Sequence, residues 1–245
     1  MKNNTLIEKL FIRRNWRALK GLRWFDIRNL LGLILPLRNL LVQDRNGEWN
    51  YIEVLHREDF STYYSIWCRE DYRTQKLDFD VIFDFGANIG LATLYFREKF
   101  PGAKIHSFEP DTDTFRILEK NVASHYGIAL FNGAVGLENG MMDFYHSETG
   151  KTSGLIREFV NDFNSKISAV KVHALRETLT PYLNRKVLIK LDVEGLEMDL
   201  LEEIARLPFQ DSCHVVFEKD INYDQSRLNN YNILSENNLI GYVKL

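Results

Sequence analysis

From about residue 80 to the carboxyl terminus, short apolar runs alternate with segments in which apolar residues recur at helical spacing. Runs of about four to eight residues rich in β-branched and aromatic side chains are typical of buried strands. The runs with this pattern are residues 81–85, 104–108, 128–131, 187–191, 213–217 and 241–245, with accessory strands predicted at 141–145 and 169–172. Helical spacing occurs at residues 91–100, 112–125, 196–207 and 226–237. Because strands that alternate with helices form parallel βαβ units, the pattern predicts an α/β fold with a doubly wound, mostly parallel sheet.

The chain before this alternation has a different pattern. Strand-like runs at residues 40–42 and 49–54 flank an Asn-Gly turn, which is a strong β-hairpin signal. Residues 60–72 are dense in aromatic side chains and predict a helix or a lid beside the main fold. Residues 1–76 are therefore expected to form an N-terminal basic helical and hairpin/lid extension, and residues 77–245 the main domain.

Charge is divided unevenly along the chain, although the formal net charge of all 245 residues is only −3. Residues 1–45 carry ten Lys and Arg against three Asp and Glu, a charge of +7, which leaves −10 on the rest. An acidic main body repels nucleic-acid phosphates, so we expect no nucleic-acid partner. The basic segment could form an amphipathic surface helix that makes a peripheral membrane contact with anionic lipid. The alternative is a cap over the sheet edge or over a second subunit of a homo-oligomer.

The number of cysteines and the hydropathy of the chain indicate the cellular compartment in which the protein is expected. Cys68 and Cys213 are too few for a disulfide framework or a four-ligand zinc site. The longest apolar run, from Leu30 to Leu37, has eight residues and is too short to span a bilayer. It also begins too late for a signal peptide, and no small-residue cleavage site follows it. We therefore expect a cytoplasmic protein without a transmembrane span.

The first predicted core strand runs into a glycine-containing turn, Asp84-Phe85-Gly86-Ala87-Asn88-Ile89-Gly90. Ligands of doubly wound sheets bind at the carboxyl ends of the strands. Gly86 allows a sharp turn with close backbone approach, and Gly90 allows the next helix to pack tightly. Asn88 stands where dinucleotide-binding loops have their second glycine, which disfavours NAD and suits a smaller nucleoside ligand with an amino-acid tail. A purely structural strand-to-helix turn is the alternative.

Glu109 ends the second core strand, 23 residues after Gly86. An acidic residue about 20 residues past a glycine turn is placed to accept both ribose hydroxyls of a nucleoside. The alternative is a carboxylate that stabilises the N-terminus of the next helix, although Asp111 and Asp113 are better placed for that task.

The fourth core strand ends in Lys190-Leu191-Asp192-Val193-Glu194-Gly195-Leu196-Glu197. Asp192 and Glu194 lie at its carboxyl end, where clustered carboxylates are costly without a ligand, a proton or a cation. Glu197 belongs either to this site or to the first turn of the following helix as a capping carboxylate. A structural role is also the alternative for Asp192.

Together these motifs resemble the FkbM-type family of S-adenosylmethionine-dependent methyltransferases. The matching segments, in the family's order, are residues 84–90, 108–110, 132–136, 190–197 and 217–219. The Asp-Val-Glu-Gly block is the most specific of them, and the resemblance covers roughly residues 80–245. The family is associated with O-methylation of sugars and other hydroxylated metabolites.

The resemblance implies a Rossmann-like class I methyltransferase that uses S-adenosyl-L-methionine. The cofactor-binding residues it implies are Asp84, Phe85, Gly86, Ala87, Asn88, Gly90, Glu109, Pro110, Asn132, Gly133, Ala134 and Asp192. In this assignment Glu109 takes the ribose hydroxyls, residues 132–134 border the adenine, and Asp192 and Glu194 face the methyl-transfer site. Fewer than 30 residues follow Phe217. This length predicts one helix and one strand, so the seventh strand of the usual class I sheet is expected to be missing or supplied elsewhere.

The leading hypothesis is therefore a methyltransferase that O-methylates a small-molecule or glycan acceptor, a saccharide or a glycosylated metabolite. Because a sugar hydroxyl is a poor nucleophile, a base must take its proton, and Asp192 is the first choice and Glu194 the second. A Mg²⁺ held by Asp192 and Glu218 could lower the pKa of the hydroxyl instead. Two carboxylates are too few to predict a metal site, and none is predicted.

Two histidines remain candidates for the general base, and two functions other than methyl transfer remain as alternatives. His146 and His173 lie in the insertion and could reach an acceptor as general base, whereas His106 and His214 lie in predicted strands and are expected to be packed. A non-catalytic methyltransferase-like binding or scaffold module in polysaccharide assembly is the main alternative. An NAD-dependent oxidoreductase is the other, and Asn88 disfavours it.

Overall fold

The structure is a computed structural model that describes residues 24–32, 37–43, 47–74, 78–147, 153–157, 166–219, 223–228, 231–236 and 240–245. The basic segment before Trp24 and the predicted turn residues 44–46 lie outside the described residues. In the described part of the chain, no helix is long and apolar enough to cross a membrane.

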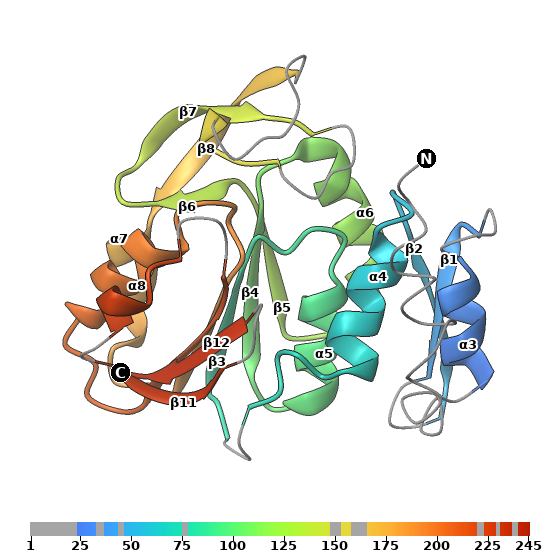
Figure 1. Cartoon of the computed structure of the whole chain (residues 1–245), viewed down its shortest axis with the longest axis horizontal. Coiled ribbons are helices and arrows are strands. Elements are labelled where there is room, and N and C mark those ends of the chain that lie inside the picture. Colours follow the sequence, from blue (N-terminus) through green and yellow to red (C-terminus); the bar gives the residue numbers. More distant parts are fainter. Residues whose placement is uncertain are drawn as a thin grey trace.

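A seven-stranded sheet of described residues forms the centre of the molecule, in the order β11-β12-β10-β9-β3-β4-β5 (Figure 1). Its strands are β3 (Val81–Phe85), β4 (Lys104–Glu109), β5 (Ile128–Asn132), β9 (Val187–Leu191), β10 (Cys213–Glu218), β11 (Asn232–Glu236) and β12 (Ile240–Lys244). The first five of these are parallel, and β12 pairs antiparallel with both β10 and β11. The chain starts the sheet in the middle at β3, builds outward to β5 and then returns to β9. This switch confirms the predicted Rossmann-like, doubly wound α/β fold of a class I methyltransferase.

The predicted helix over residues 226–237 is wrong, and so is the prediction of a missing seventh strand. A short 3₁₀ turn, Gln225–Leu228, is followed by strand β11, which pairs with β12 from Asn232 to Glu236. A register shift between Ile233 and Ser235 breaks the regular alternation of this strand, which obscures its period in the sequence. Because the 3₁₀ turn takes only four residues, the chain has room for a complete antiparallel hairpin.

Helices cover both faces of the sheet (Figure 1). On one face lie α5 (Leu91–Lys99) and α6 (Thr112–Val122), and on the other α7 (Leu175–Leu179) and α8 (Glu197–Ala205). All five residues of β3 are buried, and they alternate between the two cores: Ile82 packs with α5, whereas Phe83 and Phe85 pack with α8. Because a strand that is buried on both faces has a continuous apolar sequence, β3 could be predicted from the apolar run at residues 81–85.

The residues before the sheet pack against α5 and α6. They form α3 (Trp24–Leu31), the predicted hairpin of β1 (Asn39–Gln43) and β2 (Trp49–Glu53), and α4 (Asp59–Tyr63), which continues into one π-helical turn, Tyr64–Cys68. The Asn121 side chain of α6 accepts the Glu53 N–H at 2.8 Å and donates to the Glu53 carbonyl at 3.0 Å. The hairpin and the helical form of the aromatic segment are thus confirmed. A domain boundary after residue 76 stays a prediction.

A separate three-stranded sheet stands beyond the carboxyl ends of the parallel strands, at the top of Figure 1. It consists of β6 (Ala134–Gly136), β8 (Ile167–Ala174) and β7 (Gly140–Tyr145), in that order. The two predicted accessory strands are confirmed as β7 and β8. This sheet brings the end of β7 next to the N-terminus of α6.

Candidate active site

A cavity of about 660 Å³ opens at the carboxyl ends of β3, β4, β9 and β10, within the usual size range of small-molecule sites. Residues of α4, the π-helical turn, α5, α6 and β7 also line it. Of the residues predicted from the sequence, those that line the cavity are Gly86, Ala87, Asn88, Glu109, Pro110, Ala134, Asp192 and Glu194. The motifs that are far apart in the sequence therefore meet in one cavity, as the strand-end argument predicts.

Gly86 is required by the chain itself. Its φ is +76°, and a Cβ built on it would lie 1.8 Å from the backbone carbonyl oxygen of Asp192. The backbone N–H groups of Gly86 and Ala87 both donate to the carbonyl of Phe108, at 3.1 and 2.9 Å. At Gly86 the structure thus has a close approach between two strand-end loops, and the predicted approach of this backbone to a ligand stays a prediction.

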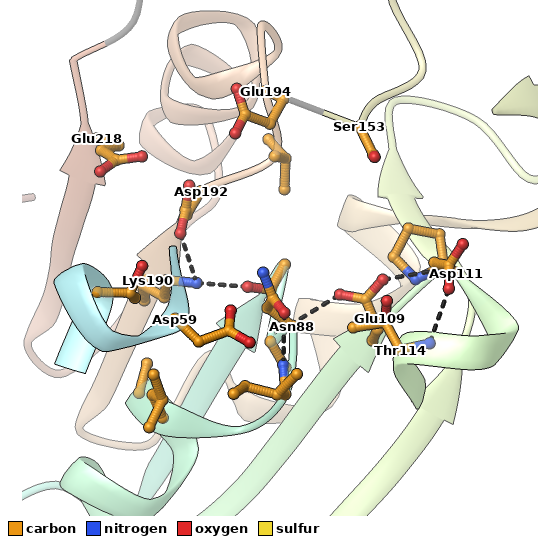
Figure 2. Close-up of a pocket in the computed structure, with 18 of the residues that line it drawn as sticks. Asp59, Asn88, Glu109, Asp111, Thr114, Ser153, Lys190, Asp192, Glu194 and Glu218 are labelled. Carbon is orange, nitrogen blue, oxygen red and sulfur yellow. Dashed lines mark hydrogen bonds and ion pairs between the residues drawn. The ribbon is translucent and has the colours of Figure 1, made fainter. Parts of the chain in front are cut away.

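Glu109 points its carboxylate toward the glycine turn and is nearly buried, with 6% of its surface exposed (Figure 2). One oxygen accepts the Asn88 N–H at 2.8 Å, and the other accepts the Asp111 N–H at 2.9 Å. Asn88 reaches this position with a left-handed φ of +50°, which asparagine tolerates. Burial raises the pKa of Glu109 to about 7, although the two N–H bonds act to lower it. Each oxygen accepts a single N–H, so lone pairs remain to accept further hydroxyl groups.

Lys190 also lines the cavity, and the sequence analysis quoted this residue without assigning it a role. Its side chain is 2% exposed, and Nζ lies 3.1 Å from both Asp84 Oδ1 and Asp192 Oδ2. It also donates to the Gly86 carbonyl at 2.6 Å. Although burial opposes it, the negative charge of the two aspartates raises the pKa of Lys190. Conversely, the ammonium group outweighs burial and lowers the pKa of Asp192.

Glu218 was considered in the sequence only as a partner of Asp192 in a possible Mg²⁺ pair, and it also lines the cavity. The register Leu191↔Phe217 places Asp192 and Glu218 side by side, one residue beyond the paired ends of β9 and β10. The negative charge of Asp192, then burial, raises the pKa of Glu218 to about 10. In the described part of the chain, no group of three or more His, Cys, Asp and Glu residues could hold a metal ion.

Glu197 holds the loop that carries Glu194. Its carboxylate accepts the N–H groups of Val193 at 2.7 Å and Gly195 at 2.9 Å, and the residue is 2% exposed. Glu197 lies in the first turn of α8, as predicted, but it does not cap the helix: its N-cap residue, Leu196, makes no side-chain capping bond, and Glu197 bonds the loop before the helix instead. Glu194 itself has a φ of +55° and lines the cavity, so the two hydrogen bonds that Glu197 accepts fix the turn that presents it.

Five predicted cofactor residues do not line the cavity: Asp84, Phe85, Gly90, Asn132 and Gly133. Contacts of Gly90, Gly133 and Asn132 with neighbouring elements give these residues a structural role beside the cavity. A Cβ on Gly90 would lie 2.8 Å from a side chain of α6, and one on Gly133 would lie 2.9 Å from His173. The Asn132 amide donates to the Glu109 carbonyl at 2.9 Å and so ties β5 to β4. Direct contact of these five residues with a cofactor stays a prediction.

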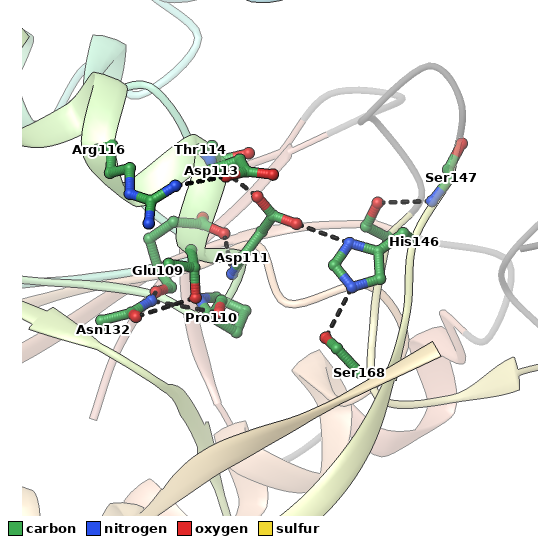
Figure 3. A network of polar contacts seen from close by, with 12 residues as sticks. Glu109, Pro110, Asp111, Asp113, Thr114, Arg116, Asn132, His146, Ser147 and Ser168 are labelled. Carbon is green, nitrogen blue, oxygen red and sulfur yellow. Dashed lines mark hydrogen bonds and ion pairs between the residues drawn. The ribbon is translucent and has the colours of Figure 1, made fainter. Parts of the chain in front are cut away.

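Asp111 and His146 form a contact that no motif indicated (Figure 3). Asp111 caps α6 by accepting the Thr114 N–H at 2.7 Å, and its other oxygen lies 2.6 Å from His146 Nδ1. The Nε2 atom of His146 lies 2.7 Å from Ser168 Oγ. This chain of bonds ties α6 to the three-stranded sheet at the edge of the cavity, which His146 lines.

Of the remaining histidines, His56 lines the cavity, whereas His106, His173 and His214 have structural surroundings. His173 lies edge-on against Phe108 and is not among the residues that line the cavity. His106 stacks on Phe83, and His214 is hydrogen-bonded to a tyrosine hydroxyl at 2.7 Å. The packed roles predicted for His106 and His214 are confirmed.

Comparison with known proteins gives the following matches. A profile of the methyltransferase FkbM domain matches residues 84–238. Methyltransferase 1 of Beauveria bassiana is 33% identical over 144 residues, which cover 51% of this chain and 58% of that protein. The 31-O-demethyl-FK506 methyltransferase FkbM of Streptomyces tacrolimicus is 44% identical over 46 residues, which cover 19% of this chain and 18% of that protein. The matched part of the chain thus spans less than two thirds of the length of either relative. Among solved structures, the fibrillarin pre-rRNA processing protein of Methanococcus jannaschii has 9% identity, a TM-score of 0.45 and coverage of 84% of this chain and 82% of that chain.

Proposed function

Since the chain belongs to the FkbM methyltransferase family, we propose that it binds S-adenosylmethionine in the strand-end cavity and methylates a hydroxyl group of a saccharide or glycosylated metabolite. The observation that carries this proposal is the carboxylate of Glu109, which faces the glycine turn with hydrogen-bonding capacity left over. It suits the pair of hydroxyls on a ribose.

The cavity also suits the charge of this cofactor. Eight carboxylate residues line it, whereas Lys190 is the only Lys or Arg among the described lining residues. That ammonium group is already shared between Asp84 and Asp192. A ligand with a positive charge near the strand ends is favoured there, and an anionic one is disfavoured. When bound, S-adenosylmethionine supplies an electrophilic methyl group on a positively charged sulfur.

The acceptor needs alignment and a base. Holding a hydroxyl oxygen near the methyl carbon can supply several kcal/mol of the barrier reduction. Asp192 remains the first candidate for the base and Glu194 the second, because both line the cavity at the end of β9. The name of the Streptomyces relative describes a substrate that lacks an O-methyl group, which supports a hydroxyl acceptor.

The acceptor chemistry is tested by following labelled methyl groups. The full chain is incubated with S-adenosylmethionine carrying a radiolabelled methyl group and with candidate saccharides. We expect the label in a product that resists mild alkali, as a methyl ether does. Release of the label as methanol under mild alkali would identify a carboxyl acceptor and contradict O-methylation of a hydroxyl.

The charge distribution supports two further proposals. We propose that the protein has no nucleic-acid partner, because the chain after residue 45 carries a charge of −10. A cytoplasmic location is also proposed, on the separate ground that the chain has only two cysteines. Contact of the basic N-terminal segment with anionic lipid, or with a second subunit, is a proposal that the sequence alone supports.

Replacing Glu109 with alanine is expected to weaken S-adenosylmethionine binding by about 1.5–3 kcal/mol, because charge-assisted hydrogen bonds to the ribose are lost. The ionised carboxylate is the better acceptor, and the pKa of Glu109 is raised to about 7. In the wild type, affinity should therefore be full above that value and fall as the pH drops through it. Isothermal titration calorimetry between pH 6 and 8 measures both effects.

The matched control for Glu109→Ala is Glu119→Gln, which alters an exposed carboxylate of α6 that is not among the residues that line the cavity. It should change the affinity little. Thermal unfolding of Glu109→Ala checks that the N–H groups left without their acceptor have not unfolded the site. An unchanged dissociation constant in a folded Glu109→Ala protein would remove Glu109 from the cofactor site.

A further inference from the structure

Asp192 and Glu218 form a carboxyl pair at the floor of the cavity. They come directly after Leu191 and Phe217, which pair with each other at the ends of two parallel strands. The backbone pairing therefore holds Asp192 and Glu218 next to each other. Both line the cavity, and Figure 2 shows their carboxyl groups on the same side of it as Glu194. The pair is thus both rigidly placed and open to a ligand.

Among the residues that the structure describes, the charges around Glu218 do not balance if both members of the pair are ionised. The charged groups that face Glu218 are Asp192, Glu194 and Lys190. The Tyr72 hydroxyl lies 3.5 Å from Asp192 Oδ2 and interacts with both carboxyl groups of the pair. Lys190 is the only ammonium or guanidinium among these groups, and it lies at 3.1 Å from two aspartates already. A second carboxylate next to Asp192 therefore requires a proton or another cation. The raised pKa of Glu218, caused first by the charge of Asp192, agrees with this balance.

The position of Glu109 shows where a cationic ligand would place its charge. Glu109 lies at the end of β4, and the pair lies at the ends of β9 and β10, with β3 and its glycine turn between them. A nucleoside whose ribose was held by Glu109, and whose other end crossed this turn toward β9, would bring a sulfonium charge to the pair, where Asp192 and Glu218 could exchange a proton for it.

We propose that Asp192 and Glu218 share one proton in the ligand-free protein, that the positive charge of S-adenosylmethionine displaces it on binding, and that the emptied pair then accepts the proton of the acceptor hydroxyl. The inference rests on the proposed function and adds Glu218 to the residues that take part in the reaction. It also explains how Asp192, whose ionised form is stabilised by Lys190, can belong to an effective base.

The proton and electron balance closes over one cycle. One proton leaves the pair when the cation binds. During transfer, the carbon–oxygen bond forms while the methyl–sulfur bond breaks, and its electron pair remains on sulfur. The hydroxyl proton passes to Glu218, and its bonding electrons stay on the acceptor oxygen. The pair then holds one proton again, beside a neutral thioether.

Calorimetry detects this exchange without any acceptor. S-adenosylmethionine and S-adenosylhomocysteine are each titrated into the full chain at pH 7, in two buffers of different ionisation enthalpy. The difference in heat between buffers gives the number of protons released. We expect about one proton released with S-adenosylmethionine and close to none with S-adenosylhomocysteine, because only the first carries the sulfonium charge. Glu218→Gln should lose the release, whereas the control Glu119→Gln should keep it.

The same experiment has a second readout in the pH dependence. Between pH 6.5 and 7.5, the ratio of the two affinities should shift toward S-adenosylmethionine by up to about tenfold in the wild type. It should stay flat in Glu218→Gln. Titration of Glu109 cancels in this ratio, because both ligands carry the same ribose.

The outcomes separate the inference from the proposed function. Equal proton release with both ligands would overturn the inference and leave cofactor binding intact. Failure of a folded protein to bind either ligand would overturn the proposed function, and the inference with it. The comparison of the two ligands uses the wild type alone, so it decides the question even if Glu218→Gln does not fold.

Discussion

Gly86→Val is expected to abolish folding. A valine Cβ at this position would lie 1.8 Å from the Asp192 carbonyl oxygen, a backbone atom that cannot move without separating β3 from β9. The φ of +76° is also strongly disfavoured for a β-branched residue. Together these effects should lower the free energy of unfolding by more than about 4 kcal/mol, which is enough to unfold a marginal domain. Urea denaturation followed by circular dichroism measures the change.

Gly102→Ala is the matched control for Gly86→Val. A Cβ at Gly102 meets no atom within 4 Å, and its φ is not left-handed. Its free energy of unfolding should stay within about 1 kcal/mol of the wild type. A Gly86→Val protein as stable as this control would contradict the backbone geometry of the glycine turn.

Lys190→Met is expected to lower the free energy of unfolding by about 3–5 kcal/mol at pH 7, because it leaves buried carboxylates without their ammonium partner. Asp84 is 0% exposed, and its other hydrogen bond, from Thr93 at 2.6 Å, carries no positive charge. Lys186→Met, at an exposed position just before β9, is the control and should have little effect. Chemical denaturation compares the two variants.

The pH dependence of stability shows whether Lys190 stabilises the protein through its positive charge. In the wild type, Lys190 lowers the pKa of Asp192, so this stabilisation is present above the ordinary aspartate value and is lost as the pH falls through the lowered one. In the variant, ionisation of the buried aspartates opposes folding, and its stability should fall as the pH rises above about 4. The deficit against the wild type should therefore shrink toward acid pH. A deficit that is constant between pH 4 and 7 would show that Lys190 acts through packing alone.

The sequence predicted the parts of the fold that have a regular period. Strand β3 is an unbroken apolar run because both of its faces are covered, and its predicted bounds coincide with the observed ones. The segment after Leu228 has no such regularity. Its strand contains a register shift, and its pairing partner β12 comes later in the chain, so local periodicity favours a helix that tertiary pairing overrides.

The candidate site was predictable where one short motif carries the chemistry. Asn88, Glu109 and Asp192 each follow a buried strand, and parallel strands bring their ends together. Lys190 was visible as a lysine within the apolar strand at 187–191, but only the fold shows that it lies between Asp84 and Asp192. This position explains why a charged residue is tolerated in a buried strand.

Contacts between separate segments could not be predicted. Asp111 and His146 are 35 residues apart, in different elements, and no spacing rule connects them. The exception is the pair of Asp192 and Glu218, which the sequence analysis had already placed together as possible Mg²⁺ ligands and which the parallel register of β9 and β10 brings side by side. Even for Gly86, the sequence indicated the close approach but not that the neighbouring atom belongs to Asp192.

The central claim is that the strand-end cavity binds S-adenosylmethionine, and its most direct test is a calorimetric titration of the purified full chain with this ligand and, separately, with NAD⁺. The account predicts one S-adenosylmethionine bound per chain, competition by S-adenosylhomocysteine, and no heat of binding with NAD⁺. A folded protein that does not bind S-adenosylmethionine would contradict the account and leave the scaffold alternative, and saturable binding of NAD⁺ would point to an oxidoreductase.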